Sequence, residues 1–328
     1  MDHLSIYGET PAFIERIAQT APLRRLRGVG MNCGCEYTSF PVFKDIAGYT
    51  RFEHSLGAAL IVWHFTRDEK QAVSALLHDV ATPVFAHVVD FMRGDHMTQT
   101  ATESGTAEII RSDGGIREAL DALGLTTEDV EDYHRYPIAD NDTPRLSADR
   151  LEYTCGNAIN FGFSSLEEIA GLYSDIIVGE NETGETELVF RTPEQALRFA
   201  RIALRCSKLY VCDADRYAMQ RLSELLSDAL TAGVVSARQL CGVESEVVEC
   251  LLSDAEFSAR WRDFCAMSRT ERAASPRGEG LWRRIPAKKR YIDPYIASLG
   301  RTSGVFAEYG AQLADFLGET QDYFVCGE

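Results

Sequence analysis

The sequence lacks a hydrophobic run long enough to cross a lipid bilayer. Hydrophobic residues make up 45% of the 328 positions, but they are dispersed along the chain. A transmembrane helix needs about 20 consecutive apolar residues. The first residues also lack a basic stretch followed by an apolar one, so we expect no signal peptide. These absences predict a cytoplasmic protein without a membrane partner.

Basic residues are scarce as well. The chain has 33 Lys and Arg against 50 Asp and Glu, which gives a formal net charge of −17. A nucleic-acid-binding surface needs a basic footprint that displaces counterions from the phosphates. The composition therefore argues against a nucleic-acid surface. An anionic substrate can bind only where local cations or a metal ion reverse the field of the whole protein.

Cysteine pairs of the CxxC type are absent, although the chain has nine cysteines. Scattered cysteines in a reducing compartment are usually packing residues, and we interpret these nine in that way. Cys33 and Cys35 are separated by one glycine, so metal ligation or redox activity is the alternative interpretation for this pair.

The patterning that is present is mostly helical, which predicts a mostly α fold. The length indicates a helical core over residues 1–232 and a smaller, mixed α/β C-terminal lobe over residues 233–328. Two strand-like runs around an Asn/Gly-containing turn predict a β-hairpin near residues 175–191. Apolar spacing and capping residues predict helices from Arg51, from Asp68 to Asp79, from Thr82, from Ser147, over 193–232 and over 244–264.

Histidine concentrates between residues 51 and 90, where four of the seven histidines occur. His78 and Asp79 are adjacent and end an apolar helical run. His54 lies on the preceding helix, which a short connection places beside the next one. Asp149, at the start of a later helix, can supply a second carboxylate. Imidazole nitrogens and carboxylate oxygens are common metal ligands, so these four residues predict a divalent metal site, with Fe, Mn, Ni, Zn and Mg all open.

Three stretches that contain these residues, RFEHSLG, ALLHDV and DRLEY, together resemble the HD-domain phosphohydrolase superfamily. Within it the sequence is most similar to the deoxynucleoside triphosphate triphosphohydrolase branch. The resemblance implies an HD-type helical core in which His54, His78, Asp79 and Asp149 hold the metal ion. It also implies hydrolysis of a phosphate-containing small molecule, a nucleotide in particular, and assembly into a homo-oligomer.

The resemblance assigns roles to residues around the metal site. Arg51 and Arg150 would bind non-bridging phosphate oxygens, as a guanidinium group does with two parallel hydrogen bonds. His87 and Asp90 would form an acid/base pair in which the carboxylate orients the imidazole.

Two further residues complete the substrate site that the resemblance implies. Tyr153 and Asn157 follow Asp149 at intervals of four residues and therefore share its helix face. Tyr153 would bond to phosphate, and Asn157 stands where the family has an aspartate that faces the sugar.

The sequence departs from the branch at several positions. Family histidines are replaced by Thr82 and Thr102, and neither threonine can act as a general acid at neutral pH. The loop that approaches base and sugar reads Met31-Asn32-Cys33. Three further histidines lack a motif and are interpreted as structural or exposed, and these are His64, His96 and His134.

Three functions remain open on this basis. The first is a metal-dependent phosphohydrolase that acts on a nucleotide, such as a deoxynucleoside triphosphate, or on another phosphate ester. The second is a phosphomonoesterase or phosphodiesterase of the same superfamily. The third is a catalytically silent HD protein that binds a nucleotide or a partner through the same site, which the threonines at positions 82 and 102 favour.

Overall fold

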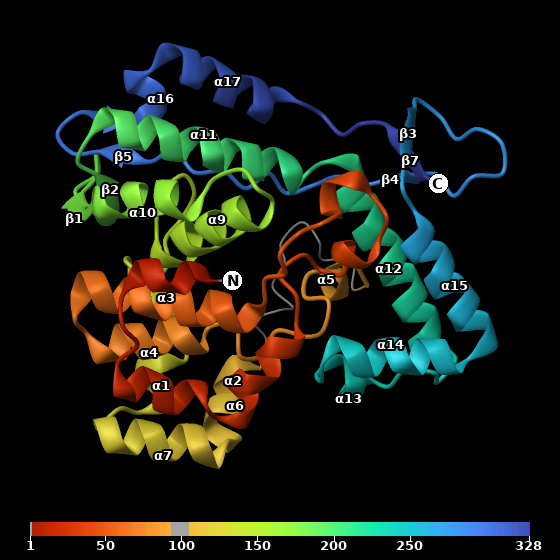
Figure 1. Cartoon of the computed structure of the whole chain (residues 1–328), viewed down its shortest axis with the longest axis horizontal. Coiled ribbons are helices and arrows are strands. Elements are labelled where there is room, and N and C mark those ends of the chain that lie inside the picture. The colour runs from red at the N-terminus through yellow and green to blue at the C-terminus, as the bar shows by residue number, and fades with distance from the viewer. Residues whose placement is uncertain (1, 93–104) are drawn as a thin grey trace.

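The computed structural model describes residues 2–92 and 105–328, and His96 and Thr102 lie outside these ranges. The described chain is mostly α-helical, as the sequence predicted (Figure 1). The α-helices are α1 (Ala12–Ala18), α2 (Ala21–Arg25), α3 (Arg51–Thr66), α4 (Glu69–Leu77), α5 (Val88–Met92), α6 (Thr106–Ser112), α7 (Gly114–Leu123), α8 (Thr127–Val130), α9 (Ala148–Asn160), α10 (Leu166–Ser174), α11 (Pro193–Leu209), α12 (Asp213–Thr231), α13 (Ala237–Leu240), α14 (Glu244–Ser253), α15 (Ala255–Ala266), α16 (Thr302–Val305) and α17 (Ala307–Gly318). Short 3₁₀ helices are η1 (Asp2–Tyr7), η2 (Leu26–Gly28), η3 (Cys35–Tyr37), η4 (Pro41–Phe43) and η5 (Tyr133–Arg135).

The start of the helix that carries His54 is set by a capping sequence. Thr50 and Glu53 form a capping box, in which the Glu53 carboxylate accepts a hydrogen bond from the Thr50 amide at 2.9 Å. The helix α3 therefore starts at Arg51 and places His54 one turn inside, where its side chain is buried. Ser147 caps α9 in a similar way, since its hydroxyl accepts from the Arg150 amide.

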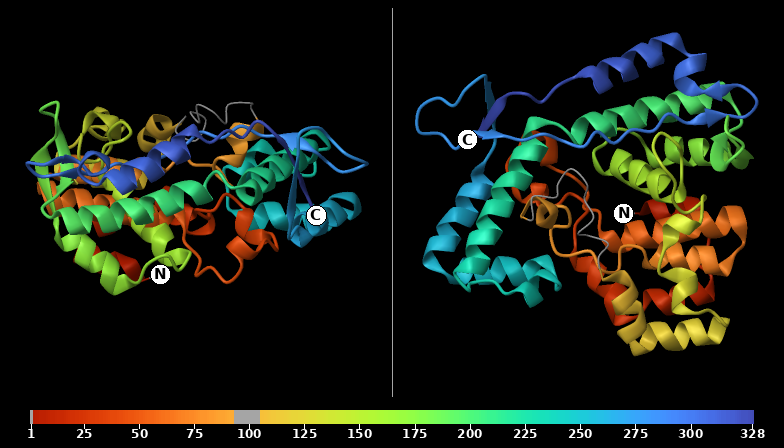
Figure 2. Two further views of the ribbon diagram at one scale, coloured as in Figure 1. Left: turned by 90° about the horizontal axis from the view of Figure 1, so that it is seen from above. Right: turned by 180° about the vertical axis from the view of Figure 1, so that it is seen from behind.

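Two large clusters of buried apolar side chains stabilise the fold. The first is built by α3, α4 and α9 together with α1, α7, α10 and one face of α11. The second is built by α5, α12, α14, α15 and the final strand. Figures 1 and 2 show α11 running along the first group and α12 leading into the second. Burial of apolar surface on this scale supplies most of the stabilisation of such a domain.

The strands form two small sheets. They are β1 (Ile176–Glu180), β2 (Thr186–Phe190), β3 (Thr270–Ala273), β4 (Arg283–Arg284), β5 (Tyr295–Ile296), β6 (Gly300–Arg301) and β7 (Phe324–Gly327). The predicted hairpin is present as β1 and β2, and the sheet continues through β5 and β6. The other sheet has the order β3-β7-β4. Residues after 290 thus pair with the hairpin, and the division after residue 232 stays a prediction.

The helix predicted from Thr82 is wrong. Residues 83–87 form a turn, and α5 begins only at Val88. Phe85 and Ala86 have φ angles of 56° and 43°, in the left-handed region, which no α-helix accommodates. The Val84 amide bonds to the carbonyl of Leu240 at 2.9 Å instead of to its own segment. This turn, rather than a helix, directs His87 toward the centre of the molecule.

Two long predicted helices are each divided in the structure. The stretch 193–232 is interrupted between α11 and α12, and the stretch 244–264 is interrupted at Asp254. The Asp254 carboxylate accepts from the amides of Glu256 and Phe257, so it caps α15 and starts a new helix. No helix in the described parts of the chain is both long and apolar enough to span a bilayer.

Candidate metal centre

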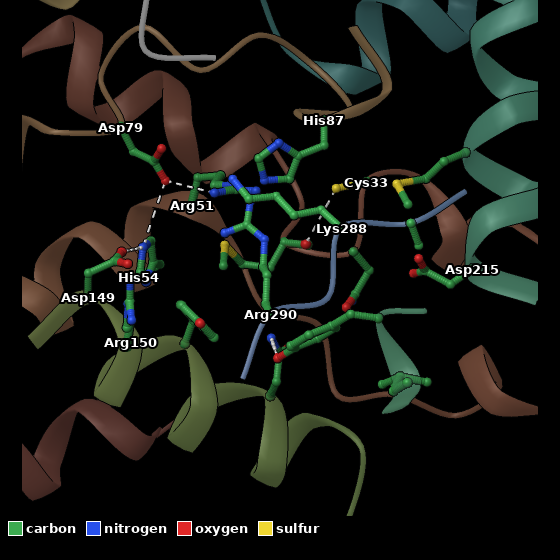
Figure 3. A pocket seen from close by; sticks show the side chains of 18 of the residues that line it. Cys33, Arg51, His54, Asp79, His87, Asp149, Arg150, Asp215, Lys288 and Arg290 are labelled. Atoms are coloured by element: carbon green, nitrogen blue, oxygen red, sulfur yellow. Dashed lines mark hydrogen bonds and ion pairs between the residues drawn. The ribbon is translucent and has the colours of Figure 1, made fainter. Parts of the chain in front are cut away.

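The four residues predicted as metal ligands come together at the junction of α3, α4 and α9, where Figure 3 shows His54, Asp79 and Asp149. The Nε2 atoms of His54 and His78 lie 3.2 Å apart. Asp149 Oδ1 is 3.0 Å from the first of these nitrogens and 3.5 Å from the second. Asp79 Oδ2 is 3.9 and 3.6 Å from the same two nitrogens. The ligand atoms of His54, His78 and Asp149 all lie within 4.8 Å of one another.

The hydrogen bonds of both imidazole rings orient them toward a cation. His78 Nδ1 is 2.7 Å from the carbonyl of Ala75, which can only accept, so this nitrogen carries the hydrogen. His54 Nδ1 is 2.7 Å from a carboxylate oxygen of Glu152. In the neutral rings both Nε2 lone pairs therefore face each other and the two aspartates. Two imidazoles and two carboxylates with their outer nitrogens fixed in this way fit a divalent metal ion.

The electrostatics of the cluster also favour a positive charge at its centre. Burial alone would lower the pKa of His54, but hydrogen bonds to Asp149 and Glu152 raise it to about 10. Burial opposes ionisation of Asp149 as well, yet its hydrogen bond to His54 and the nearby imidazole charges lower its pKa to about 2. Both shifts indicate that the carboxylates stabilise a cation where the Nε2 atoms meet.

A carboxylate behind the cluster, missed by the sequence analysis, holds His54 in place. Glu152 is fully buried and also accepts from His3 Nε2 at 2.8 Å and from the hydroxyl of Tyr49. It reaches His54 because Gly57 leaves space, since a Cβ there would lie 2.5 Å from Glu152 Oε1. The signal was present in the sequence, because Gly57 ends RFEHSLG and Glu152 lies inside DRLEY.

Asp79 is held by two neighbours. Arg51 Nη1 lies 2.9 Å from Asp79 Oδ2, and the hydroxyl of Thr82 donates to Asp79 Oδ1 at 2.7 Å. Burial opposes the ionised form, but the charges of Arg51 and the two histidines keep the pKa of Asp79 below its usual range. Thr82 thus positions this carboxylate. The Nε atom of Arg51 is buried and has no hydrogen-bond partner among the described residues.

A cavity of about 420 Å³ opens from the metal cluster, within the size range of small-molecule sites. His87, Arg150, Tyr153 and Asn157 line it together with the cluster, and the roles that the resemblance assigns to them stay predictions. Asp90 lies behind the wall, fully buried, with its Oδ2 atom 2.9 Å from His87 Nδ1. Burial and the charges of Arg290 and Arg51 outweigh this hydrogen bond and lower the pKa of His87.

The α9 residues present different groups to the cavity. Arg150 donates from Nη1 to the carbonyl of Arg145 at 3.1 Å, which steadies its guanidinium. Burial raises the pKa of Tyr153 to about 12, so its hydroxyl stays protonated at neutral pH. Asn157 donates to the hydroxyl of Tyr210 at 2.9 Å, while its Oδ1 atom is buried without a hydrogen-bond partner in the described chain.

No protein-family model matches the chain. It is 26% identical over 309 residues to the metal-dependent phosphohydrolase cns2 of Cordyceps militaris, which covers 89% of this chain and 83% of that one. The name of this relative agrees with the metal-dependent phosphohydrolase activity that the sequence predicted. The chain is also 26% identical over 250 residues to the uncharacterized protein YdhJ of Bacillus subtilis, covering 75% and 73% of the two chains.

Two solved structures have the same overall fold. A hypothetical protein from Aquifex aeolicus aligns over 97% of this chain and 93% of its own, with a TM-score of 0.65 and 18% identity. A phosphohydrolase from Bacteroides thetaiotaomicron aligns over 95% and 94%, with a TM-score of 0.63 and 15% identity. The cluster and the named relative together support a divalent metal cofactor, while the deoxynucleotide-specific branch stays a prediction.

Several cavity residues were not singled out from the sequence. Lys288 and Arg290 line the cavity from a segment far along the chain, and the run Lys288-Lys289-Arg290 in so acidic a protein was the available signal. His134, interpreted as structural or exposed, is half-exposed and lines the cavity as well. Its Nδ1 atom lies 2.7 Å from Asp140. Asp215 lines the wall on α12, where burial raises the pKa of its carboxyl to about 8.

Proposed function

We propose that this protein is a metal-dependent phosphohydrolase that cleaves a phosphate ester or anhydride of a small molecule, with nucleotides as the first candidates. One observation carries the proposal. Two imidazole Nε2 atoms face each other at 3.2 Å beside two carboxylates, and their outer nitrogens are fixed as donors. The name of the fungal relative and the size of the cavity support the same function.

In this proposal His54, His78, Asp79 and Asp149 hold the divalent ion. Such an ion supplies Lewis acidity toward phosphate oxygens and makes water a better nucleophile. Arg51 keeps Asp79 ionised and oriented through its 2.9 Å contact. Arg150 lies next to Asp149 in the cavity wall and binds a non-bridging oxygen of the phosphoryl group.

His87 and Asp90 provide proton transfer. Asp90 accepts from His87 Nδ1, so the neutral ring presents Nε2 as a proton acceptor. The lowered pKa of His87 keeps that acceptor form populated at neutral pH. Tyr153 donates a hydrogen bond to phosphate. Asn157 offers its Oδ1 atom to a hydroxyl of the substrate, because this oxygen has no partner in the described chain.

The proposal is tested with His78→Ala and Asp79→Ala, compared with the unaltered protein. Elemental analysis is combined with a hydrolysis panel of nucleotides, phosphomonoesters and phosphodiesters. Both variants are expected to lose bound metal and phosphate release together. Hydrolysis that persists in a variant without metal contradicts the proposal. The product separates the alternatives, since release of triphosphate, pyrophosphate or orthophosphate identifies which bond is cleaved.

A catalytically silent binding protein is the second candidate, and Thr82 favours it. The branch places a histidine at this position, whereas here a buried hydroxyl is bonded to Asp79. This candidate predicts that metal and nucleotide bind without turnover on any substrate of the panel. Hydrolysis by the purified protein that disappears in Asp79→Ala rules it out.

A further inference from the structure

The chain immediately before α9 is attached to the small sheet that contains the predicted hairpin. Thr143, in this stretch, lines the cavity, and Asp149 and Arg150 follow in the first turn of α9. Figure 3 shows the last two side chains next to each other at the metal end of the cavity. The amide of Leu188 on β2 donates to the carbonyl of Leu146 at 3.3 Å. The start of α9 is therefore bonded directly to this sheet.

Glu187, the neighbour of Leu188 on β2, holds Leu146 through its side chain. Its Oε1 atom accepts a hydrogen bond from the Leu146 amide at 2.9 Å, and the whole side chain is buried. Its Oε2 atom accepts from the side-chain amide of Asn181 at 3.1 Å. Both backbone groups of Leu146 are thus bonded to β2, which fixes this residue relative to the sheet.

Arg301 on β6 orients the Glu187 carboxylate. Its Nη1 and Nη2 atoms donate to the two carboxylate oxygens at 2.7 and 2.8 Å, a bidentate arrangement that restricts both groups. Arg301 Nη1 also donates to the carbonyl of Asp293 at 3.1 Å. The Asp293 amide in turn donates to the carbonyl of Pro144 at 3.0 Å. The guanidinium therefore supports the stretch before α9 along two routes.

This buried ion pair is not the arrangement that stability alone would favour. Removing a carboxylate and a guanidinium from water carries a large solvation cost, and well-packed apolar residues in their place are often as stable. Apolar residues, however, offer no acceptor to the buried amide of Leu146. Neither Glu187 nor Arg301 lines the cavity. The pair therefore acts on the cavity through Leu146, by fixing the backbone that leads into α9.

Two residues of the proposed site depend on this backbone. Asp149 follows Leu146 by three positions, and its amide donates to the carbonyl of Ala139 at 3.1 Å. Arg150 Nη1 donates at 3.1 Å to the carbonyl of Arg145, the residue immediately before Leu146. A displacement of Leu146 therefore moves the carboxylate beside the two imidazoles together with the guanidinium in the cavity wall.

We propose that Glu187 is a positioning residue which, oriented by Arg301, fixes Leu146 and thereby sets the places of Asp149 at the metal cluster and of Arg150 in the cavity. Glu187 itself touches neither the metal ion nor the substrate. The part of this inference that concerns Arg150 rests on the proposed function. The part that concerns Asp149 is measured by metal binding, which needs no turnover.

The first test is the double variant Glu187→Leu with Arg301→Met, which removes both charges and leaves neither member of the pair without its partner. Its metal affinity, measured by competition with a chelator well below the unfolding temperature, should fall by about 10-fold, the lower end for groups that orient metal ligands. Glu187→Gln keeps an oxygen for the Leu146 amide and should retain most of the affinity. An unchanged affinity in the double variant, or an equal loss in Glu187→Gln, overturns the inference.

The matched control is a second bidentate pair on α12 and β4. Arg283 donates to the two carboxylate oxygens of Glu224 at 2.6 and 3.2 Å, and neither residue lines the cavity. Glu224→Leu with Arg283→Met should leave metal affinity unchanged, whatever its effect on the unfolding temperature. Amide hydrogen exchange in residues 144–150 should accelerate in the Glu187 double variant and not in this control. Equal losses of metal affinity in the two double variants would show general destabilisation and contradict the inference.

The second test measures kcat and KM at saturating metal for a substrate that the unaltered protein hydrolyses. The Glu187 double variant should raise KM more than it lowers kcat, because Arg150 binds the phosphoryl group before the reaction as well as during it. An unchanged KM contradicts the part of the inference that concerns Arg150. An absence of hydrolysis in the unaltered protein contradicts the proposed function, while the metal-affinity comparison still decides the role of Glu187.

Discussion

The metal cluster and the His87–Asp90 pair use the same two residue types in opposite surroundings. His54 lies among carboxylates, and although burial works against it their hydrogen bonds raise its pKa to about 10. His87 also bonds to a carboxylate, but burial and the charges of Arg290 and Arg51 lower its pKa. The surroundings of His54 favour a positive charge, whereas the surroundings of His87 favour a neutral imidazole.

This contrast shows that the neighbours of an imidazole decide its role. Both rings are fixed through Nδ1, so both present Nε2. At His54 the next groups are Asp149 and His78, which favour a shared cation. At His87 the single carboxylate of Asp90 is outweighed by burial and by the charges of Arg290 and Arg51, so the neutral ring is favoured. The following substitutions break or sharpen this comparison.

His54→Gln has the largest expected effect. It removes one ligand and the carboxylate-oriented nitrogen, so bound metal should fall to near zero and activity by about 10³-fold or more, because metal-ion catalysis supplies several kcal/mol. Elemental analysis and the hydrolysis panel measure both quantities. Full metal content in this variant would show that the four residues do not form the ligand set.

His87→Gln is expected to keep the metal and lose about 10²-fold in activity, the lower end for a removed proton acceptor. In the unaltered protein kcat/KM should be constant above the pKa of His87 and fall as the pH drops through it, below the ordinary value of 6.5, because protonation removes the acceptor. The variant should lose this acidic limb. An unchanged pH profile in the variant would show that His87 is not the proton acceptor of the reaction.

Glu152→Gln addresses the support of the cluster. The amide keeps the size of the side chain but weakens the hydrogen bond to His54 Nδ1, so metal affinity should fall about 10- to 100-fold. Competition with a chelator measures the affinity. Asp90→Asn is the matched carboxylate change outside the cluster and should leave metal affinity unaltered. Equal losses of metal affinity in the two variants would show that the metal cluster and the His87–Asp90 pair do not differ in their effect on the metal ion.

Thr82→Val has the smallest expected effect. It deletes the hydroxyl that donates to Asp79 Oδ1 at 2.7 Å while retaining a β-branched shape. The lost hydrogen bond is worth about 1 kcal/mol, which corresponds to about a fivefold weaker metal affinity. The same chelator competition detects this change. An affinity equal to that of the unaltered protein would show that Arg51 alone holds Asp79 in position.

The sequence predicted the four candidate ligands from local patterns, namely helix faces and the adjacent His78–Asp79 pair at the end of α4. His54 follows a capping box, and Asp149, Tyr153 and Asn157 repeat along one helix face. The predicted hairpin and the mostly α class are present for the same reason, since short-range periodicity and turn residues specify them. Local signals were sufficient for these parts of the structure.

The features that escaped prediction depend on contacts between distant segments. The turn before α5 replaces a helix because Val84 bonds to Leu240, which is far along the chain. Glu152 gains its role from His54, and Glu187 from Arg301, and neither contact has a local pattern. Thr82 is an exception, because its hydrogen bond to Asp79 spans only three residues, and no pattern in the sequence marks that bond.

The glycine at position 57 has a consequence for genetics. A methyl group there would lie 2.5 Å from Glu152 Oε1, so the carboxylate would have to leave His54. In a random-mutagenesis screen for metal-free protein, alanine at this position should therefore be recovered together with changes at the ligands. The positions of such substitutions would identify both the ligand residues and the space beside Glu152 that must stay free of a side chain.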